Sequence, residues 1–349
     1  MTEGGPIQIA GGGLAGLSLA LSLRSAGIPV QVTEAGQYPR HRVCGEFLSG
    51  RGLEILGNLG ILAQCQAAGA RMASTVCFAT PRQLGVVRPL PEPALCLSRH
   101  RLDALLASEV ASRGGVLRTG IRVATGTLGA GWVRATGRRI ATPGAACRWF
   151  GIKAHATGVP LSADLEMHFS PGAYVGLCRL DADRVNVCGL FRRRPGEPES
   201  MAGSILDRLR GPAHTLLRTR LQDAHFDPAS VCSVGGLDLR LPGVHSQGEL
   251  VLGDAIAMIP PLTGNGMSLA LESSDLATGP LADFARGRRH WIDACREVQR
   301  RHHEAFSRRL RIAGLLQRLL FLPVVPSLLF RAIPNDGFLW RALFAATRA

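Results

Sequence analysis

The first 35 residues of the chain show two successive patterns of hydrophobic positions. Residues 7–10 form a short apolar run, and leucines then recur at helical spacing from residue 14 until Gly27. A second apolar run follows at residues 29–35. Short apolar runs are typical of buried strands, and a recurrence every three to four residues is typical of helices. This stretch therefore predicts a strand, a helix that ends at a glycine, and a second strand.

The middle of the chain has the alternation of half-buried strands, and its last third has helical spacing. Residues 70–97 alternate, and residues 147–195 predict three strands, of which the second runs unbroken over residues 165–180. The turn sequence at residues 181–184 joins the second of these strands to the third as a hairpin. Residues 204–221 predict two short helices separated by a proline.

The apolar stretch at residues 312–330 is the most lipid-like part of the sequence. Arg318, Pro323 and Pro326 interrupt it, whereas a membrane span needs about 20 mostly apolar residues. We therefore expect a buried or interfacial pair of short amphipathic helices here and no membrane span.

The chain has 349 residues and a formal net charge of +14, and all but one of its 40 basic residues are arginines. Two kinds of explanation for this charge stay open. One is codon bias with a solvated surface. The other is a negatively charged partner: an anionic cofactor, an acyl carrier protein or an anionic membrane surface. No basic run is interleaved with aromatic residues, so a nucleic acid partner is not expected.

The cysteines indicate a reducing compartment. There are nine of them, scattered along the chain, and no two are spaced as C-x-x-C. An odd, scattered set argues against both a disulfide framework and a zinc site, so no metal is expected. Residues 1–5 lack the basic and apolar regions of a signal peptide. We expect a cytoplasmic protein, with peripheral contact to the inner face of the membrane as an open alternative.

A glycine-rich turn lies between the first strand and the first helix. Gly11, Gly13 and Gly16 give the pattern G-x-G-x-x-G, and Glu34 ends the second strand. In such a unit the glycines provide a tight turn, close approach of the backbone to a pyrophosphate, and close packing of helix on strand. The helix N-terminus favours phosphate, and the acid accepts a hydrogen bond from a ribose hydroxyl. The stretch predicts a dinucleotide site but does not separate NAD from FAD.

Three later segments distinguish FAD from NAD. They read RHRVCGEFLSG at residues 40–50, LSRHRLDALLA at residues 97–107 and VLGDAIAMIPPLTGNGMSLAL at residues 251–271. With the glycine turn, and in this order, they resemble the FAD-dependent oxidoreductases of the superfamily that includes p-hydroxybenzoate hydroxylase-like aromatic hydroxylases and geranylgeranyl reductases. The resemblance implies an α/β fold: a Rossmann-like FAD-binding domain with an inserted, mostly antiparallel β-sheet substrate domain and a helical C-terminus.

The resemblance also implies how the chain is divided and which residues contact FAD. The FAD-binding domain is expected from residues 1–69, 98–146 and 245–310, the substrate domain from residues 70–97 and 147–244, and a helical C-terminal segment from residues 311–349. The start of the helix after the third segment can stabilise negative charge on a reduced flavin ring. The expected FAD contacts are Gly11, Gly13, Ala15, Gly16, Glu34, Arg42, Arg99, Gly253, Asp254, Pro261, Gly264, Asn265, Gly266 and Met267.

The sequence departs from the family in three places. Thr136 stands where members usually have the aspartate of a G-A-D-G motif, and no second nucleotide fingerprint is present, so NADPH or NADH is expected to bind transiently. The W-x-W-x-I-P motif of flavin-dependent halogenases is absent. The aromatic strand of the reductase branch keeps Tyr174, but Gly176 replaces its tryptophan.

Lys153, the only lysine, lies on the first expected strand after the altered motif at Thr136. Alternation gives this strand two faces. Phe150, Ile152 and Ala154 share one face, and Trp149, Gly151, Lys153 and His155 share the other. If the second face lines the pocket, a cation and a proton-transfer group stand above the flavin. If the first face does, Lys153 and His155 are solvent or interface residues. The candidate catalytic residues are Lys153, His155 and Cys44, and the candidate substrate contacts are Phe150, Ile152 and Tyr174.

Cys44 has two interpretations, because it is either a reactive group near the flavin or a small buried residue. Three functions also stay open. The first is a monooxygenase that hydroxylates or epoxidises an apolar, aromatic or polyketide-like molecule, free or carrier-tethered, with NAD(P)H and O2. The second is a reductase or dehydrogenase of carbon–carbon bonds in a lipid or isoprenoid. The third is a flavin-binding protein without turnover.

Overall fold

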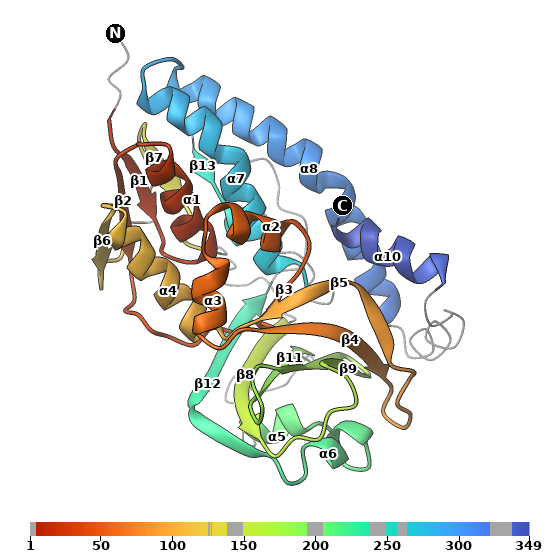
Figure 1. Ribbon diagram of the computed structural model, residues 1–349. Helices are drawn as coiled ribbons and strands as arrows, with labels where there is room; N and C mark the ends of the chain where they lie inside the picture. Colours follow the sequence, from red (N-terminus) through yellow and green to blue (C-terminus); the bar gives the residue numbers. More distant parts are fainter. Residues whose placement is uncertain are drawn as a thin grey trace.

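The computed structural model contains two β-sheets flanked by helices (Figure 1). The expected α/β class, the mostly antiparallel second sheet and the helical C-terminus are confirmed. Within the described ranges, no helix is apolar over a length that spans a bilayer. The structure describes residues 5–124, 126, 128–137, 149–193, 205–237, 249–256, 264–321 and 337–348.

The N-terminal unit is built on a five-stranded sheet with the order β13-β7-β1-β2-β6. All its pairs are parallel, and β1 and β2 begin their register at Ile7 and Val30. Because the chain supplies these strands from three distant stretches, it must leave this unit and return to it. The strands are β1 (Ile7–Ala10), β2 (Val30–Glu34), β6 (Val116–Thr119), β7 (Trp132–Arg134) and β13 (Leu250–Val251).

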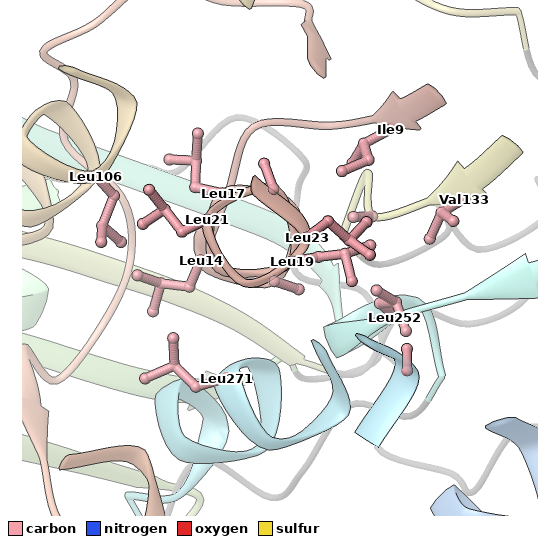
Figure 2. Packing of buried hydrophobic residues seen from close by; sticks show 14 of the residues in the cluster. Ile9, Leu14, Leu17, Leu19, Leu21, Leu23, Leu106, Val133, Leu252 and Leu271 are labelled. Carbon is pink, nitrogen blue, oxygen red and sulfur yellow. The ribbon is translucent and has the colours of Figure 1, made fainter. Parts of the chain in front are cut away.

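Helix α1 (Leu14–Ser25) is the centre of the largest apolar core. Figure 2 shows its leucines on all sides of the helix, with Leu106 of α4 (Arg99–Ser112), Leu271 of α7 (Gly266–Ala285) and Val133 of β7 around them. A helix that is apolar all round is stable only when it is buried. This packing holds α1 in place, and its N-terminus lies directly after the glycine turn that follows β1.

The second sheet has eight strands in the order β12-β8-β11-β10-β9-β4-β5-β3. Its pairs are antiparallel except β4 with β9, which is parallel. The single strand expected over residues 165–180 is wrong: the chain reverses at Gly172, whose φ of 75° suits a turn, and forms two strands. The strands are β3 (Phe47–Leu48), β4 (Arg71–Ala79), β5 (Arg88–Cys96), β8 (Trp149–Thr157), β9 (Leu165–Ser170), β10 (Ala173–Arg179), β11 (Val185–Arg192) and β12 (His225–Leu237).

Short helices cover the outer faces of both units. The pair expected over residues 204–221 is confirmed as α5 (Ile205–Arg210) and α6 (Leu216–Arg220), which lie below β8 and β11 in Figure 1. In the N-terminal unit, α2 (Arg51–Asn58) packs on α7 and α3 (Leu62–Ala67) packs on α4, and a single turn, η1 (Gly253–Ala255), follows β13.

The C-terminal part is a long helix with a shorter one packed on it. Helix α8 (Trp291–Leu320) runs along α7, and α10 (Phe338–Arg348) packs on α8 (Figure 1). The pair of short helices expected over residues 312–330 is therefore wrong for its first part, which continues α8. Arg318 does not interrupt that helix, because its side chain is exposed. Residues 322–330 lie outside the described ranges.

Candidate active site

A cavity of about 1310 Å³ lies between the two sheets. Ligand sites in proteins usually measure about 300–1,000 Å³, so this cavity is larger than one drug-sized molecule requires. One end is lined by the glycine turn, Glu34 and several arginines, and the other by aromatic and aliphatic side chains. The two ends therefore suit different ligands, an anionic one and an apolar one.

The three glycines of the turn have different surroundings. Gly11 has a φ of 108°, and a Cβ at this position would overlap the Ala135 carbonyl, while a Cβ on Gly16 would overlap the carbonyl of Gly11. These two glycines are required by packing inside the protein. A Cβ on Gly13, by contrast, would meet no atom within 4 Å. Gly13 lines the cavity at the N-terminus of α1, where the free backbone N–H groups favour a phosphate.

Glu34 is held in place by three donors. Its Oε2 accepts from the Gly12 amide at 2.6 Å, and its Oε1 accepts from the Gly36 amide at 2.8 Å and from Arg40 Nη1 at 2.7 Å. Burial acts to raise the pKa of Glu34, but the hydrogen bonds from Arg40, Gly36 and Gly12 lower it to about 2. A carboxylate offers about four acceptor positions, so Glu34 keeps capacity for a ribose hydroxyl.

Five arginines line this end of the cavity: Arg40, Arg42, Arg99, Arg122 and Arg134. Arg99 is fixed by a bidentate pair with Asp103, with N···O distances of 2.6 and 2.8 Å. Among the described residues, Arg40 Nε and Nη2 and Arg42 Nε are buried without a hydrogen-bond partner. Buried donors are costly unless they are satisfied. Guanidinium groups bind phosphate oxygens strongly, so these atoms fit a diphosphate.

The start of α7 forms the opposite wall. Gly264 has a φ of 66°, and a Cβ there would overlap the ring of Phe47. Gly264, Gly266 and Met267 line the cavity, and Asn265 is the residue that precedes the helix. A helix N-terminus carries partial positive charge, which stabilises an anionic ring placed against it.

Comparison with known proteins identifies the cofactor. The sequence model of the FAD binding domain family matches residues 6–142. The chain is an FAD-binding protein. The glycine turn, the acid and the unsatisfied arginine donors fit this cofactor. A comparison with curated proteins gave no significant match.

Solved flavoproteins share the fold of the whole chain. The flavin-dependent brominase Bmp2 matches with a TM-score of 0.78 at 18% identity, over 98% of this chain and 94% of that one. PqsL from Pseudomonas aeruginosa, a probable FAD-dependent monooxygenase, matches with a TM-score of 0.70 at 17% identity, over 98% of both chains.

A third match of the fold is to a reductase-like protein. A geranylgeranyl bacteriochlorophyll reductase-like protein from Thermoplasma acidophilum gives a TM-score of 0.75 at 16% identity, over 98% of this chain and 95% of that one. The family match identifies an FAD-binding domain over residues 6–142, and the fold shared with the solved flavin-dependent proteins agrees with it. The resemblance of the sequence motifs is thereby confirmed.

Most of the expected FAD contacts of this flavoprotein lie at the cavity wall. Gly16 lies behind the turn, Asn265 precedes α7, and Pro261 lies outside the described residues. Their individual roles stay predictions. The residues at the wall are Gly11, Gly13, Ala15, Glu34, Arg42, Arg99, Gly253, Asp254, Gly264, Gly266 and Met267.

The two faces of β8 are now assigned. Ile152 and Ala154 pack with Leu209 of α5 and Leu217 of α6, and Phe150 packs against the same cluster. The expectation that Phe150 and Ile152 contact substrate is therefore contradicted, because α5 and α6 cover their face of the sheet. The other face turns towards the cavity, since Gly151 lines it. Of the expected substrate contacts, Tyr174 lies at the cavity wall.

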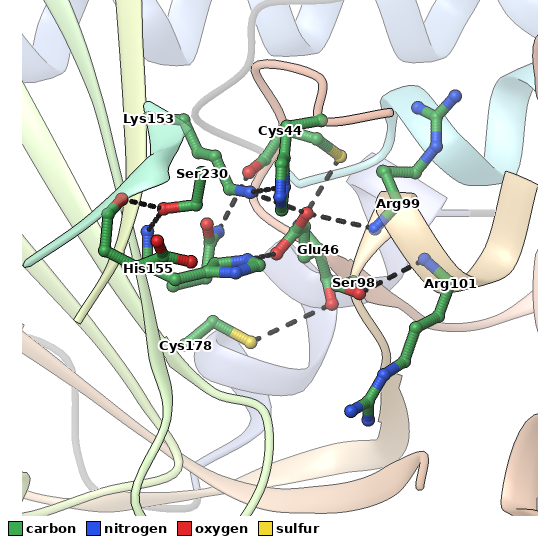
Figure 3. Close-up of polar contacts among 12 residues, drawn as sticks. Cys44, Glu46, Ser98, Arg99, Arg101, Lys153, His155, Cys178 and Ser230 are labelled. Atoms are coloured by element: carbon green, nitrogen blue, oxygen red, sulfur yellow. Dashed lines mark hydrogen bonds and ion pairs between the residues drawn. The ribbon is translucent and has the colours of Figure 1, made fainter. Parts of the chain in front are cut away.

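Lys153 and His155 share the face of Gly151, but both contact a carboxylate that the sequence analysis missed (Figure 3). Lys153 Nζ lies 3.3 Å from Glu46 Oε1, and His155 Nε2 lies 2.7 Å from Glu46 Oε2. The Arg99 amide donates to Glu46 Oε1 at 2.9 Å. Lys153 and Glu46 are completely buried. These side chains therefore lie at an interface inside the protein, and not in solvent.

His41 extends this cluster towards the surface. Lys153 Nζ lies 2.9 Å from His41 Nδ1, and the His41 ring stacks on His100 with centroids 4.5 Å apart. Burial and then the neighbouring Lys153 lower the pKa of His41 to about 4. The ring is therefore neutral near pH 7 and can accept a hydrogen bond from the lysine.

Cys44 lines the cavity, and its carbonyl accepts from Asn186 Nδ2 at 2.9 Å. Burial raises the pKa of the Cys44 thiol, so the nucleophilic thiolate is disfavoured. This argues against a reactive thiolate, although the side chain is half-buried at the cavity wall. Within the part of the chain that the structure describes, no cluster of His, Cys, Asp or Glu is arranged to hold a metal ion.

Sequence reasoning missed Glu46, His41 and Arg40. Glu46 and His41 lie inside the segment RHRVCGEFLSG that identified the family. The signal for Glu46 was an acid in an apolar, glycine-containing stretch of a chain with one lysine.

Proposed function

We propose that this flavoprotein is a monooxygenase that hydroxylates or epoxidises an apolar, aromatic small molecule with NAD(P)H and O2. The observation that carries the proposal is the apolar end of the cavity. Phe78 and Trp340 meet edge to face with ring centroids 5.9 Å apart, and Phe169 lies 6.2 Å from Tyr174. Aromatic rings prefer such tilted contacts, so this end offers planar surfaces to an aromatic ligand.

Two C-terminal helices close this apolar end. Leu316 and Leu320 of α8 and Trp340 and Phe344 of α10 line it, and Trp340 Nε1 donates to the Pro89 carbonyl at 3.0 Å. That hydrogen bond holds α10 against β5. Such a cover keeps water from the apolar end, which protects reactive species from hydrolysis and leakage.

The polar end orients the cofactor. Glu34 and the arginines around it would hold the adenosine and diphosphate part of FAD, and the start of α7 would stabilise negative charge on its ring. When bound, FAD supplies the redox chemistry, which in a monooxygenase is the activation of oxygen. The residues of the chain bind and orient FAD and the substrate, and they exclude water.

A reductase of carbon–carbon double bonds is the second candidate. Aliphatic side chains continue the apolar end along the sheet, at Leu165, Met167, Leu177 and Leu190, which also suits an isoprenoid chain. The motif VCGEFLS of the reductase-like branch favours this alternative.

One experiment separates the two reactions. The FAD-loaded protein is incubated with NADPH or NADH and with panels of phenols and isoprenoids, in ¹⁸O₂ and under nitrogen, and product masses are measured. An oxygen-dependent product that contains one ¹⁸O atom supports the monooxygenase. A product that gains two hydrogens under nitrogen contradicts it and supports the reductase.

The end of α8 and the start of α10 support an anionic membrane surface as the partner. Leu315 is 60% exposed and Phe338 is 88% exposed, and Arg311, Arg318 and Arg341 are exposed on the same two helices. Apolar side chains flanked by arginines suit an anionic lipid interface. An apolar substrate dissolved in that interface would be near the helices that close the cavity.

A further inference from the structure

We propose that Glu46, Lys153 and His155 form an anchor that holds residues 42–47, one wall of the cavity, in the position that binds FAD. The inference rests on cofactor binding alone and does not depend on the reaction proposed above. It also gives the single lysine a positioning role without contact to the substrate.

Glu46 faces away from the cavity that its neighbours line. Arg42, Val43, Cys44, Gly45 and Phe47 are all at the cavity wall. The buried side chain of Glu46 points instead towards β8, as Figure 3 shows. Its φ of 61° is unusual for a residue other than glycine, and such a conformation persists only where the surroundings hold it.

Three donors hold Glu46. They are Lys153 Nζ at 3.3 Å, His155 Nε2 at 2.7 Å and the Arg99 amide at 2.9 Å. Burial alone would raise the pKa of Glu46, but His155 and Lys153 lower it, so the carboxylate stays charged. A buried charge is tolerated only when it is paired and hydrogen-bonded. Each partner therefore depends on the others, and together they fix the backbone at residue 46.

The position of Glu46 determines the positions of its neighbours on both sides. The next residue, Phe47, is so close to Gly264 that a Cβ there would overlap its ring, so Phe47 limits the approach of the loop before α7. On the other side, the Cys44 carbonyl accepts from Asn186 of β11. A shift of residue 46 would displace the wall that carries Cys44 and the contact with Gly264.

A second buried ion pair provides a matched control. Arg309 Nη1 of α8 lies 2.6 Å from Glu272 Oε2 of α7, and both side chains are buried. Neither residue is part of the cavity wall. Loss of this pair should destabilise the protein without moving residues 42–47.

The test measures the dissociation constant of FAD and the visible circular dichroism of bound FAD in Glu46→Gln, Lys153→Met and the control Glu272→Gln. We expect the first two variants to raise the dissociation constant at least tenfold and to change the dichroism of the flavin. The control should lower the thermal midpoint while its dissociation constant stays within about twofold of wild type. Tenfold corresponds to about 1.4 kcal/mol.

His155 supplies variants that keep the charge pair intact. His155→Ala removes one donor to Glu46, and His155→Gln restores an N–H donor of similar reach. We expect His155→Ala to weaken FAD binding at least threefold and His155→Gln to recover it. This pair decides the matter if either charge variant fails to fold. FAD binding and dichroism unchanged in His155→Ala would overturn the anchor, and so would equal weakening by Glu272→Gln.

Discussion

The amine of Lys153 lies 3.3 Å from a carboxylate oxygen of Glu46, and both side chains are completely buried. Lys153→Met leaves the Glu46 charge buried without this partner, and breaking a buried pair costs about 3–5 kcal/mol. The free energy of unfolding in urea should fall by about that amount. The double variant Glu46→Gln/Lys153→Met carries no unpaired charge and should recover most of the loss. A Lys153→Met protein as stable as wild type would contradict the pairing.

The glycine turn predicts two separable effects. Gly13→Ala adds a methyl group at the cavity, with no protein atom within 4 Å, so the thermal midpoint of the FAD-free protein should not change. Its affinity for FAD should fall at least tenfold, because the methyl group lies where the phosphate approaches. Gly16→Ala instead meets the carbonyl of Gly11 and should lower the thermal midpoint itself. Calorimetry and FAD titration of both variants check this, and the opposite pattern would refute it.

His41 predicts a loss of stability in mild acid. Its pKa is about 4 in the folded protein and 6.5 ordinarily, so between these values the unfolded chain binds the proton more readily. Stability should therefore fall as the pH drops from about 6.5 towards 4. His41→Gln keeps an acceptor for Lys153 but does not titrate. Urea midpoints measured between pH 7 and pH 4.5 should fall less steeply in this variant than in wild type. If the two midpoints fall in parallel, His41 is not the group that causes the loss of stability.

The closure of the apolar end predicts a change in substrate range. Phe344 is buried at the cavity wall, and Phe344→Ala enlarges that end. We expect turnover of bulkier members of an aromatic substrate panel to rise relative to smaller ones, with FAD affinity unchanged. Leu106→Ala, in the core on α4, should lower stability without altering the preference. An unchanged preference in Phe344→Ala would show that α10 does not bound the substrate.

Membrane contact predicts salt-sensitive binding to anionic vesicles. Phe338 and Leu315 are exposed, so Phe338→Ser/Leu315→Ser should fold normally and bind such vesicles at least fivefold more weakly. Vesicles of neutral lipid, and anionic vesicles at high salt, should retain little protein because the electrostatic attraction is lost. Sedimentation with vesicles measures this. Binding to acyl carrier protein with none to vesicles would replace the membrane by the carrier.

The sequence predicted the first strand, glycine turn, helix and second strand well because their pattern is local. Gly16 is constrained within the turn itself, and the first helix and two strands lie within a few residues of the predicted positions; only the contact of Gly11 with Ala135, just after β7, comes from a distant part of the chain. Such a motif is complete in a short stretch of chain. The turn at Gly172 was missed for another reason: the alternation on both sides of it favoured one long strand, although Pro171 and Gly172 are turn-forming residues.

The orientation of β8 could not be predicted, because it depends on what covers each face. Alternation separates Ile152 from Lys153, but only the packing of α5 and α6 shows that the Ile152 face is the covered one. The partner of Lys153 is equally non-local, since Glu46 lies more than a hundred residues earlier in the chain. Pairing between distant polar residues leaves no periodic trace in the sequence.

The single lysine has a practical consequence for measuring motion in this protein. Apart from the chain's own N-terminus, Lys153 carries the only primary amine, and that amine is completely buried against Glu46 and His41. An amine-reactive reagent can reach it only when β8 and the segment that contains Glu46 separate. The rate of labelling at Lys153 thus reports how often this one contact opens. No residue has to be introduced by mutation to carry the label.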